Sequence, residues 1–180
     1  MKAAKRVTEI QEYYFSRKLK EIAKRNAAGE QIISLAIGSP DLPPSIQTIE
    51  KMCEVSREPD AHGYQPTVGT PELRAAMAGF YRRWYGVALD AQTEILPLIG
   101  SKEGILHTTL AFVDPGDKVL VPDPGYPTYT SLSKILGAEI VNYPLREDND
   151  WQPDFDLLEK MDITGVKLMW VNYPNMPTGG

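Results

Sequence analysis

The chain has 180 residues, of which 42% are hydrophobic, and a formal net charge of −5. That length is enough for one α/β domain with its own core, or for part of a larger protein. The acidic balance argues against nucleic acid and against an anionic membrane surface as partners.

Cysteine and histidine usage excludes two common kinds of site. Cys53 is the only cysteine, so an intrachain disulfide is impossible and a reducing compartment fits. His62 and His107 are the only histidines and lie far apart in the sequence, so no metal site is predicted. The N-terminus lacks an apolar signal core, and no stretch is long and apolar enough to span a bilayer. We therefore expect a cytoplasmic protein.

An amphipathic helix is predicted from residue 7 to about residue 28, and Gly29 can end it. Its many charges suit an arm lying on a partner subunit, or equally a plain surface helix of the same domain. The apolar side consists of Ile10, Tyr13, Tyr14, Leu19, Ile22 and Ala23.

A short strand is predicted over residues 32–37, followed by a proline-stiffened loop that begins at Gly38. Gly38 either allows the backbone to approach a ligand closely or only makes the turn. Ser45 is expected to cap a helix that runs to about Arg57 and buries Cys53 in the core.

Residues 60–69 form a predicted loop that contains Tyr64, whose hydroxyl either faces a ligand or packs the loop down. Thr70 and Pro71 then suit the N-cap and first position of a helix, and Gly86 lies just past its end. The expected buried side of this helix consists of Leu73, Met77, Phe80, Tyr81 and Trp84.

A strand, a glycine turn and a helix are predicted from residue 94 to residue 113. Residues 94–99 suit a buried strand, Gly100 a tight turn and Ser101 a helix N-cap. A helix N-terminus attracts anions, so the amides near Ser101 and Lys102, with the Ser101 hydroxyl, could hold a phosphate. The alternative is an ordinary capped helix.

Strands and helices alternate through the rest of the chain. Strands are expected over 118–121, 138–143 and 166–171, and helices over 126–136 and from the cap Asp154 to Met161. This order predicts a three-layer α/β fold with a mostly parallel sheet and helices on both faces. Ligands bind such sheets beyond the carboxyl ends of the strands, where the loops 100–101, 123–129 and 172–180 would meet.

Five motifs, in order, resemble the N-terminal part of the pyridoxal-phosphate-dependent aminotransferases of fold type I, class I/II, on the aspartate and diaminopimelate side. The resemblance covers residues 32–180, and together the motifs are far more specific than any one of them. They are Leu35–Asp41, Gly63–Arg74, Gly100–Gly104, Asp123–Pro127 and Asn172–Gly179.

The resemblance implies roles for individual residues. Ser101 and Lys102 would hold the cofactor phosphate, and Tyr126 would stack on the pyridine ring. Tyr64 matches a tyrosine lent across a homodimer interface to the neighbouring subunit's phosphate. Gly38 matches a backbone position that lies against the substrate carboxylate.

One position departs from the family. The asparagine that donates to the phenolic oxygen of the cofactor is replaced here by Met176, which cannot donate a hydrogen bond. Asn175, one residue earlier, is the candidate to take over, unless the oxygen is held from elsewhere.

The resemblance also implies a division of the chain and of the chemistry. Residues 1–45 would be an N-terminal arm with a small-domain segment, and residues 46–180 the first part of a large cofactor-binding domain. The lysine that forms the Schiff base, the aspartate under the pyridine nitrogen and a carboxylate-binding arginine all lie after the Pro-Thr-Gly loop in this family. This chain is therefore expected to be an incomplete fold type I domain with no catalytic residue of its own.

The implied activity is transfer of an amino group between an amino acid and a 2-oxo acid. Two alternatives remain open from sequence: a lyase or synthase that uses the same cofactor, and a non-catalytic module on the same scaffold. Met176 is the feature that favours the module.

We predict that the 180-residue chain alone does not catalyse transamination, because the reactive lysine is not among its residues. The measurement is turnover with added pyridoxal phosphate. Turnover clearly above that of the free cofactor would contradict this expectation.

Overall fold

Two compact units make up the chain in the computed structural model, which describes residues 2–8, 12–35, 37–38 and 40–180. One unit is Glu12–Pro97, and the other contains Leu98–Gly180 together with the N-terminal residues up to 11. Residues 9–11 of the first predicted helix, with Ile10 among them, and Ala36 of the first predicted strand lie outside the described residues.

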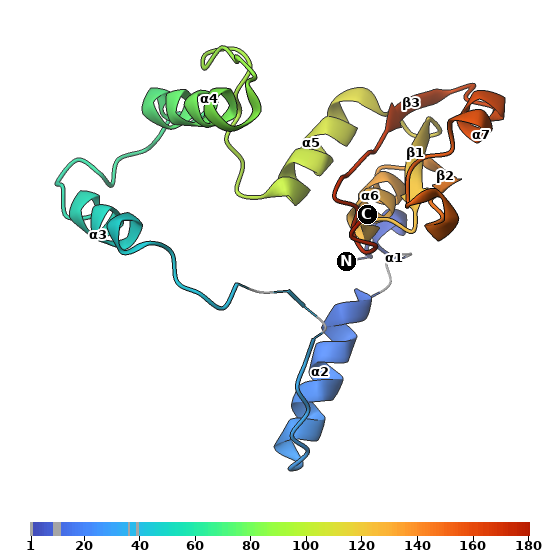
Figure 1. Ribbon diagram of the computed structural model, residues 1–180, viewed down its shortest axis with the longest axis horizontal. Helices are drawn as coiled ribbons and strands as arrows, with labels where there is room; N and C mark the ends of the chain where they lie inside the picture. Colours follow the sequence, from blue (N-terminus) through green and yellow to red (C-terminus); the bar gives the residue numbers. More distant parts are fainter. Residues whose placement is uncertain (1, 9–11, 36, 39) are drawn as a thin grey trace. The chain divides into compact units, whose positions relative to one another are not determined.

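A parallel sheet organises the unit that contains Leu98–Gly180 (Figure 1). Its strands follow the order β2-β1-β3, and β1 pairs in parallel with both neighbours. The strands are β1 (Lys118–Asp123), β2 (Glu139–Pro144) and β3 (Val166–Met169). The helices are α1 (Lys5–Thr8), α5 (Ser101–Phe112), α6 (Pro127–Ile135) and α7 (Phe155–Lys160), with a 3-10 turn at Glu147–Asn149.

Both faces of the sheet are covered, which confirms the predicted α/β architecture. On one face, Val119 and Val121 pack with Ile105 of α5 and Tyr129 of α6. On the other, Leu120 packs with a cluster that includes Leu158 of α7. Successive residues of a strand point to opposite faces, so β1 is buried on both sides. Figure 1 shows α5 and α6 on one side of the sheet and α7 on the other.

Local sequence signals set the ends of these elements. Asp154 accepts a hydrogen bond from the Leu157 N–H at 3.0 Å and so caps α7, as predicted. Gly137 follows α6 with a φ of 85°, a conformation that glycine adopts without strain, and it ends the helix as expected.

Three helices make up the unit Glu12–Pro97 within its described residues: α2 (Tyr14–Ala27), α3 (Ile46–Val55) and α4 (Pro71–Tyr85). Ser45 caps α3 by accepting from Thr48 N–H, and Thr70 caps α4 by accepting from Leu73 N–H, both at 3.3 Å. Gly86 ends α4 in the left-handed region at a φ of 69°. The predicted starts of α3 and α4 and the predicted end of α4 at Gly86 are therefore confirmed.

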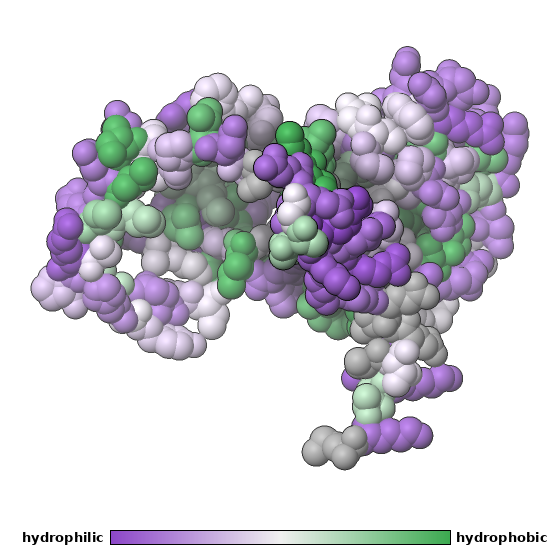
Figure 2. Space-filling model, turned by 90° about the horizontal axis from the view of Figure 1, so that it is seen from below, coloured by the Kyte–Doolittle hydropathy of each residue, from purple (hydrophilic) through white to green (hydrophobic). Residues whose placement is uncertain are grey.

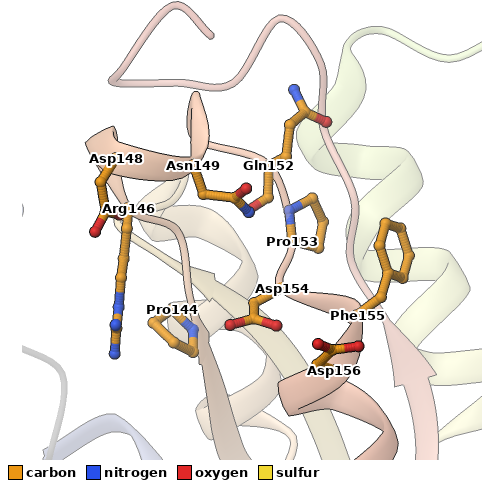
Figure 3. Close-up of a pocket in the computed structure, with 9 residues that line it drawn as sticks. All are labelled: Pro144, Arg146, Asp148, Asn149, Gln152, Pro153, Asp154, Phe155 and Asp156. Carbon is orange, nitrogen blue, oxygen red and sulfur yellow. The ribbon is translucent and has the colours of Figure 1, made fainter.

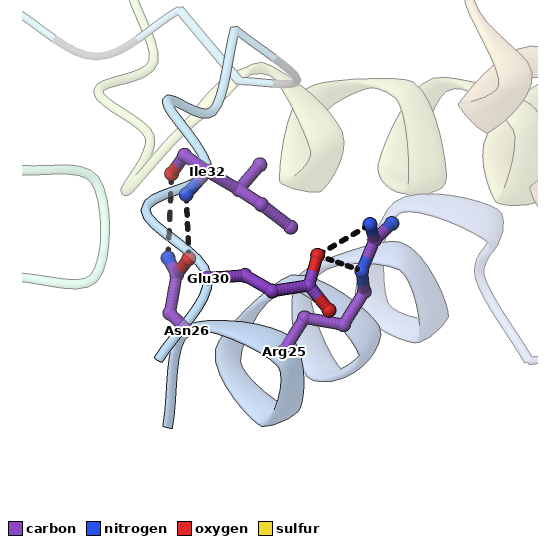
Figure 4. A network of polar contacts seen from close by, with 4 residues as sticks. All are labelled: Arg25, Asn26, Glu30 and Ile32. Carbon is purple, nitrogen blue, oxygen red and sulfur yellow. Dashed lines mark hydrogen bonds and ion pairs between the residues drawn. The ribbon is translucent and has the colours of Figure 1, made fainter. Parts of the chain in front are cut away.

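The end of α2 is held by side chains rather than by a core (Figure 4). Arg25 donates to the Glu30 carboxylate through two of its nitrogens. The Asn26 amide accepts from the Ile32 N–H at 2.7 Å and donates to the Ile32 carbonyl at 3.3 Å. The Arg25 and Glu30 side chains are exposed, so the ion pair contributes little stability, and the Asn26 amide mainly orients the chain leaving α2.

Two predicted strands are not formed. Residues 94–99 and the described part of 32–37 have no strand conformation. A strand is stabilised by hydrogen bonds to a neighbouring strand, and the described sheet consists of β1, β2 and β3 only. Apolar periodicity alone therefore misassigned both segments.

The expected buried sides of α3 and α4 remain on the surface. Cys53 is exposed rather than in a core, and Trp84 is 67% exposed. The aromatic residues of α4 pack on one another instead, with Tyr81 and Tyr85 at 5.4 Å between ring centroids. Hydrophobic residues, drawn in green, accordingly reach the surface in Figure 2.

The boundary between the two units lies at 97/98, whereas the sequence predicts a domain boundary at 45/46. The predicted boundary concerns the complete family fold and stays a prediction. Within the described residues, no helix combines the length and the apolar character needed to cross a bilayer.

Tyr143 supplies a test of this packing. It is 1% exposed, and its hydroxyl donates to the Trp170 carbonyl at 2.6 Å, which joins β2 to the end of β3. Tyr143→Phe leaves that carbonyl without its donor, so we expect the free energy of unfolding to fall by about 1–2 kcal/mol in urea titrations. Tyr173→Phe, which removes a more exposed hydroxyl bond to Trp151 at 2.8 Å, is the matched control and should cost less.

The same residue predicts a pH dependence. Burial, and then the neighbouring tyrosines Tyr173 and Tyr129, raise the pKa of Tyr143 from 10.0 to about 12. The folded state therefore keeps a proton that the unfolded state loses, so this stability is complete below pH 10 and is lost as the pH rises towards 12. In Tyr143→Phe the free energy of unfolding should fall less between pH 10 and pH 12 than in the parent protein. An equal fall in both proteins would contradict the raised pKa of Tyr143 as its cause.

Candidate functional site

Three connections lie towards the carboxyl edge of the sheet. β1 ends at Asp123 and β3 at Met169, and because the strands are parallel these ends share one edge. α5 leads through a short turn into the opposite end of β1, so its N-terminus at Ser101 lies towards the carboxyl edge as well. This arrangement is the one expected from the order of elements.

The N-terminus of α5 begins one residue earlier than the sequence predicts. Gly100 is the N-cap and makes no side-chain capping bond, while Ser101 is the first helical residue. The prediction of Ser101 as the N-cap is therefore wrong. The Glu103 carboxylate reaches back to accept the Ile99 N–H at 2.7 Å, which ties the residue before the N-cap to the first turn of the helix without capping it.

The electrostatics of this helix end suit an anion. The N–H groups of the first turn of a helix have no partners within the helix and carry a partial positive charge. Ser101 and Lys102 are exposed there. The Glu103 carboxylate is held to the side, since one oxygen accepts from Ile99 and the other lies 3.5 Å from His107 Nε2.

The connection between β1 and α6 is a tight turn that positions Tyr126. A Cβ at Gly125 would clash with the Pro122 carbonyl oxygen and would lie 2.8 Å from Pro122 Cγ, so only glycine fits. Tyr126 follows as the N-cap of α6, with Pro127 as the first helical residue. The turn thereby delivers the Tyr126 ring to the carboxyl edge.

An aromatic stack supports Tyr126 from behind. Its ring meets the Tyr129 ring edge-on at 5.6 Å and 85°. Tyr129, which is 6% exposed, in turn stacks on Trp170 at 5.0 Å and 11°. Burial, with a smaller effect of Tyr126, raises the pKa of Tyr129, so its phenol stays neutral. Sequence analysis missed this stack, although tyrosines three residues apart on a helix are a usable signal.

Asn175 joins the loop after β3 to the turn before Tyr126. Its Nδ2 donates to the Pro124 carbonyl at 3.3 Å and to Thr178 Oγ1 at 2.9 Å. The side chain is 2% exposed, and its Oδ1 is buried without a hydrogen-bond partner. Met176, in contrast, is 38% exposed. The structure therefore brings Asn175 and the Tyr126 turn together.

Two predicted site residues, Gly38 and Tyr64, lie in the other unit. Tyr64 is 95% exposed, and a Cβ at Gly38 would meet no atom within 4 Å. Both positions are open enough to meet a ligand or a partner, and their roles stay predictions.

A hollow of about 450 Å³ beside the end of β2 was not predicted (Figure 3). Arg146 lies on one side of it, with Asp154 and Asp156 at the start of α7 on the other. Asp154 already serves as the cap of α7, which points to a structural role. Among the described residues, no group of three or more His, Cys, Asp or Glu is placed to hold a metal ion.

Comparison with known sequences identifies the family. Residues 30–180 match the family described as aminotransferase class I and II, and the chain belongs to that family. The LL-diaminopimelate aminotransferase of Dehalococcoides mccartyi (strain ATCC BAA-2266) is 46% identical over 179 residues. The enzyme of the same name from Moorella thermoacetica is 44% identical over 179 residues. Each alignment covers 99% of this chain and 46% of the relative, so the chain spans about half the length of these proteins.

Solved structures place the fold among the fold type I aminotransferases. BacF from Bacillus subtilis in its apo form has a TM-score of 0.92 and 38% identity, covering 100% of this chain and 46% of BacF. An alanine aminotransferase from Pyrococcus furiosus has a TM-score of 0.89 and 33% identity, covering 99% of this chain and 46% of that enzyme. The resemblance drawn from the motifs is thus confirmed, as is the incomplete fold type I architecture.

Gly125→Ala tests the turn that positions Tyr126. The added Cβ must displace the main chain at Pro122, so we expect a loss of about 2 kcal/mol or more in the free energy of unfolding. Gly79→Ala is the matched control, because nothing lies within 4 Å of a Cβ there and alanine favours the interior of α4. If both substitutions had the same effect in thermal unfolding, the tight turn would not be essential.

Proposed function

We propose that this chain forms the cofactor-binding part of a pyridoxal-phosphate-dependent aminotransferase, which transfers an amino group between an amino acid and a 2-oxo acid. The observation that carries the proposal is one edge of the sheet where the N-terminus of α5, the Tyr126 turn and the Asn175 loop lie, in a chain of the aminotransferase family.

The residues at this edge fit the cofactor. The first-turn N–H groups at Ser101 and Lys102, with the Ser101 hydroxyl, offer hydrogen bonds and a positive dipole end to the phosphate. Gly100, the N-cap of α5, has no side chain that could block the approach of the phosphate, and the helix end has no side-chain capping bond. Tyr126 offers a flat face to the pyridine ring and is kept in place by Tyr129.

When bound, pyridoxal phosphate supplies a conjugated, electron-withdrawing ring that stabilises negative charge on the substrate carbon. The residues of this chain bind and orient that ring. Lys102 belongs to the phosphate cup in this proposal and not to the proton transfers, which need a lysine from elsewhere in the complete enzyme.

The proposal also gives roles to Gly38 and Tyr64, which belong to the unit Glu12–Pro97. We assign the Gly38 main chain to the substrate carboxylate and the Tyr64 hydroxyl to the phosphate of a neighbouring subunit. A homodimer follows from that assignment, and the 95% exposure of Tyr64 is compatible with it.

The substrate that we propose first is LL-diaminopimelate. Relatives named for it are 46% and 44% identical to this chain, whereas the alanine aminotransferase structure is 33% identical. The lyase, synthase and non-catalytic alternatives are not favoured, because these relatives are named aminotransferases.

The test uses the protein expressed from its complete coding sequence. We expect a visible absorbance band with bound pyridoxal phosphate, and transamination of a 2-oxo acid with LL-diaminopimelate faster than with alanine or aspartate. A protein that retains no cofactor and shows no amino transfer with any of these donors would contradict the proposal.

Ser101→Ala tests the phosphate cup within that protein. Removal of one hydrogen bond to a charged phosphate should weaken cofactor binding about tenfold or more, measured by titration of the apoprotein with pyridoxal phosphate. Ser131→Ala, at an exposed serine of α6, is the control and should leave the affinity unchanged. Equal affinities for both variants would remove Ser101 from the site.

A further inference from the structure

Asn175 is placed unusually for a residue in a loop. Among the described residues 171–180 it is the one with a buried side chain, while the residues on either side of it are exposed. Burying an amide costs free energy unless its polar groups are bonded, so such a residue has a specific structural partner. Here that partner belongs to a different loop, 51 residues away in sequence.

The orientation of the amide is fixed by what it touches. The Pro124 carbonyl can only accept a hydrogen bond, so the nitrogen of the Asn175 side chain must face it. The second N–H is used by Thr178 Oγ1. Both amide protons are therefore engaged, and the atom without a partner is Oδ1, an acceptor.

The main chain of Asn175 closes its own loop at the same time. Its N–H donates to the Gly180 carbonyl and its carbonyl accepts from the Gly179 N–H, both at 2.7 Å. The residue thus holds the Pro-Thr-Gly turn through its backbone and reaches the neighbouring loop through its side chain. A displacement of either loop has to break bonds at Asn175.

The loop that it reaches is the one that carries Tyr126. Pro124 lies two residues before Tyr126, and the intervening Gly125 is pressed against Pro122, so the segment has little freedom to absorb a shift. We propose that Asn175 is a positioning residue that fixes the Tyr126 ring against the cofactor, rather than a donor to the cofactor's phenolic oxygen. This inference rests on the proposed function and assigns Asn175 a part that Met176 cannot play.

The first experiment needs no cofactor. In hydrogen-exchange measurements on the chain, Asn175→Ala should raise the exchange rate of the segment 124–129 about tenfold, the effect of one lost buried hydrogen bond. Asn172→Ala is the matched control in the same loop, because its amide bonds locally to the Pro174 carbonyl at 3.3 Å. Unchanged exchange at 124–129 in Asn175→Ala would overturn the link, whatever the function of the protein.

Asn175→Asp separates positioning from simple loss of volume. The carboxylate has nearly the same shape but no proton to donate, and it would repel the Pro124 carbonyl. We expect it to behave like Asn175→Ala at neutral pH and to recover protection at 124–129 when acid protonates it. If hydrogen exchange at 124–129 were as slow in Asn175→Asp as in the parent protein at neutral pH, the positioning role of Asn175 would be contradicted.

The second experiment concerns the cofactor in the protein from the complete coding sequence. Visible circular dichroism reports the orientation of the bound ring, so Asn175→Ala should change this signal and weaken binding about tenfold, while Asn172→Ala changes neither. If the parent protein bound no cofactor, the proposed function would fail and the exchange result would stand. If the parent bound it and Asn175→Ala left the signal unchanged, the positioning role would fail alone.

Discussion

The structure depends on the burial of β1 on both faces. Val119, Leu120 and Val121 are at most 4% exposed, and they pack alternately into the two clusters that hold α5 and α6 on one side and α7 on the other. A strand in this position needs a hydrogen-bonded neighbour at each edge, which β2 and β3 provide in parallel register. Because the pairing is parallel, the strands end at the same edge of the sheet, and the loops that carry Tyr126 and Asn175 begin there.

The candidate site is built from main-chain constraints more than from charged groups. Gly100 leaves the end of α5 open, Gly125 lets the next turn pass close to Pro122, and Asn175 ties a third turn to the second. Such a site is preorganised, because the loops are held before any ligand arrives. An aromatic stack through Tyr129 and Trp170 connects it to the core.

The family assignment and the geometry support each other without being equivalent. Family membership rests on the match over residues 30–180 and implies a cofactor, whereas the physical fit rests on the open helix end and the supported ring of Tyr126. Because the chain spans about half the length of its relatives, the activity of the whole protein and its reactive groups belong to the proposal.

The sequence by itself determined the helix caps at Ser45, Thr70 and Asp154, the alternation of the last strands and helices, and the family, because these depend on neighbouring residues and on motif order. It misassigned the strand at 94–99, since a strand requires a partner that local pattern cannot supply. Only the tertiary structure decided that Asn175 reaches Pro124 and that Tyr129 stacks on Trp170, because these contacts join residues that lie far apart in the sequence.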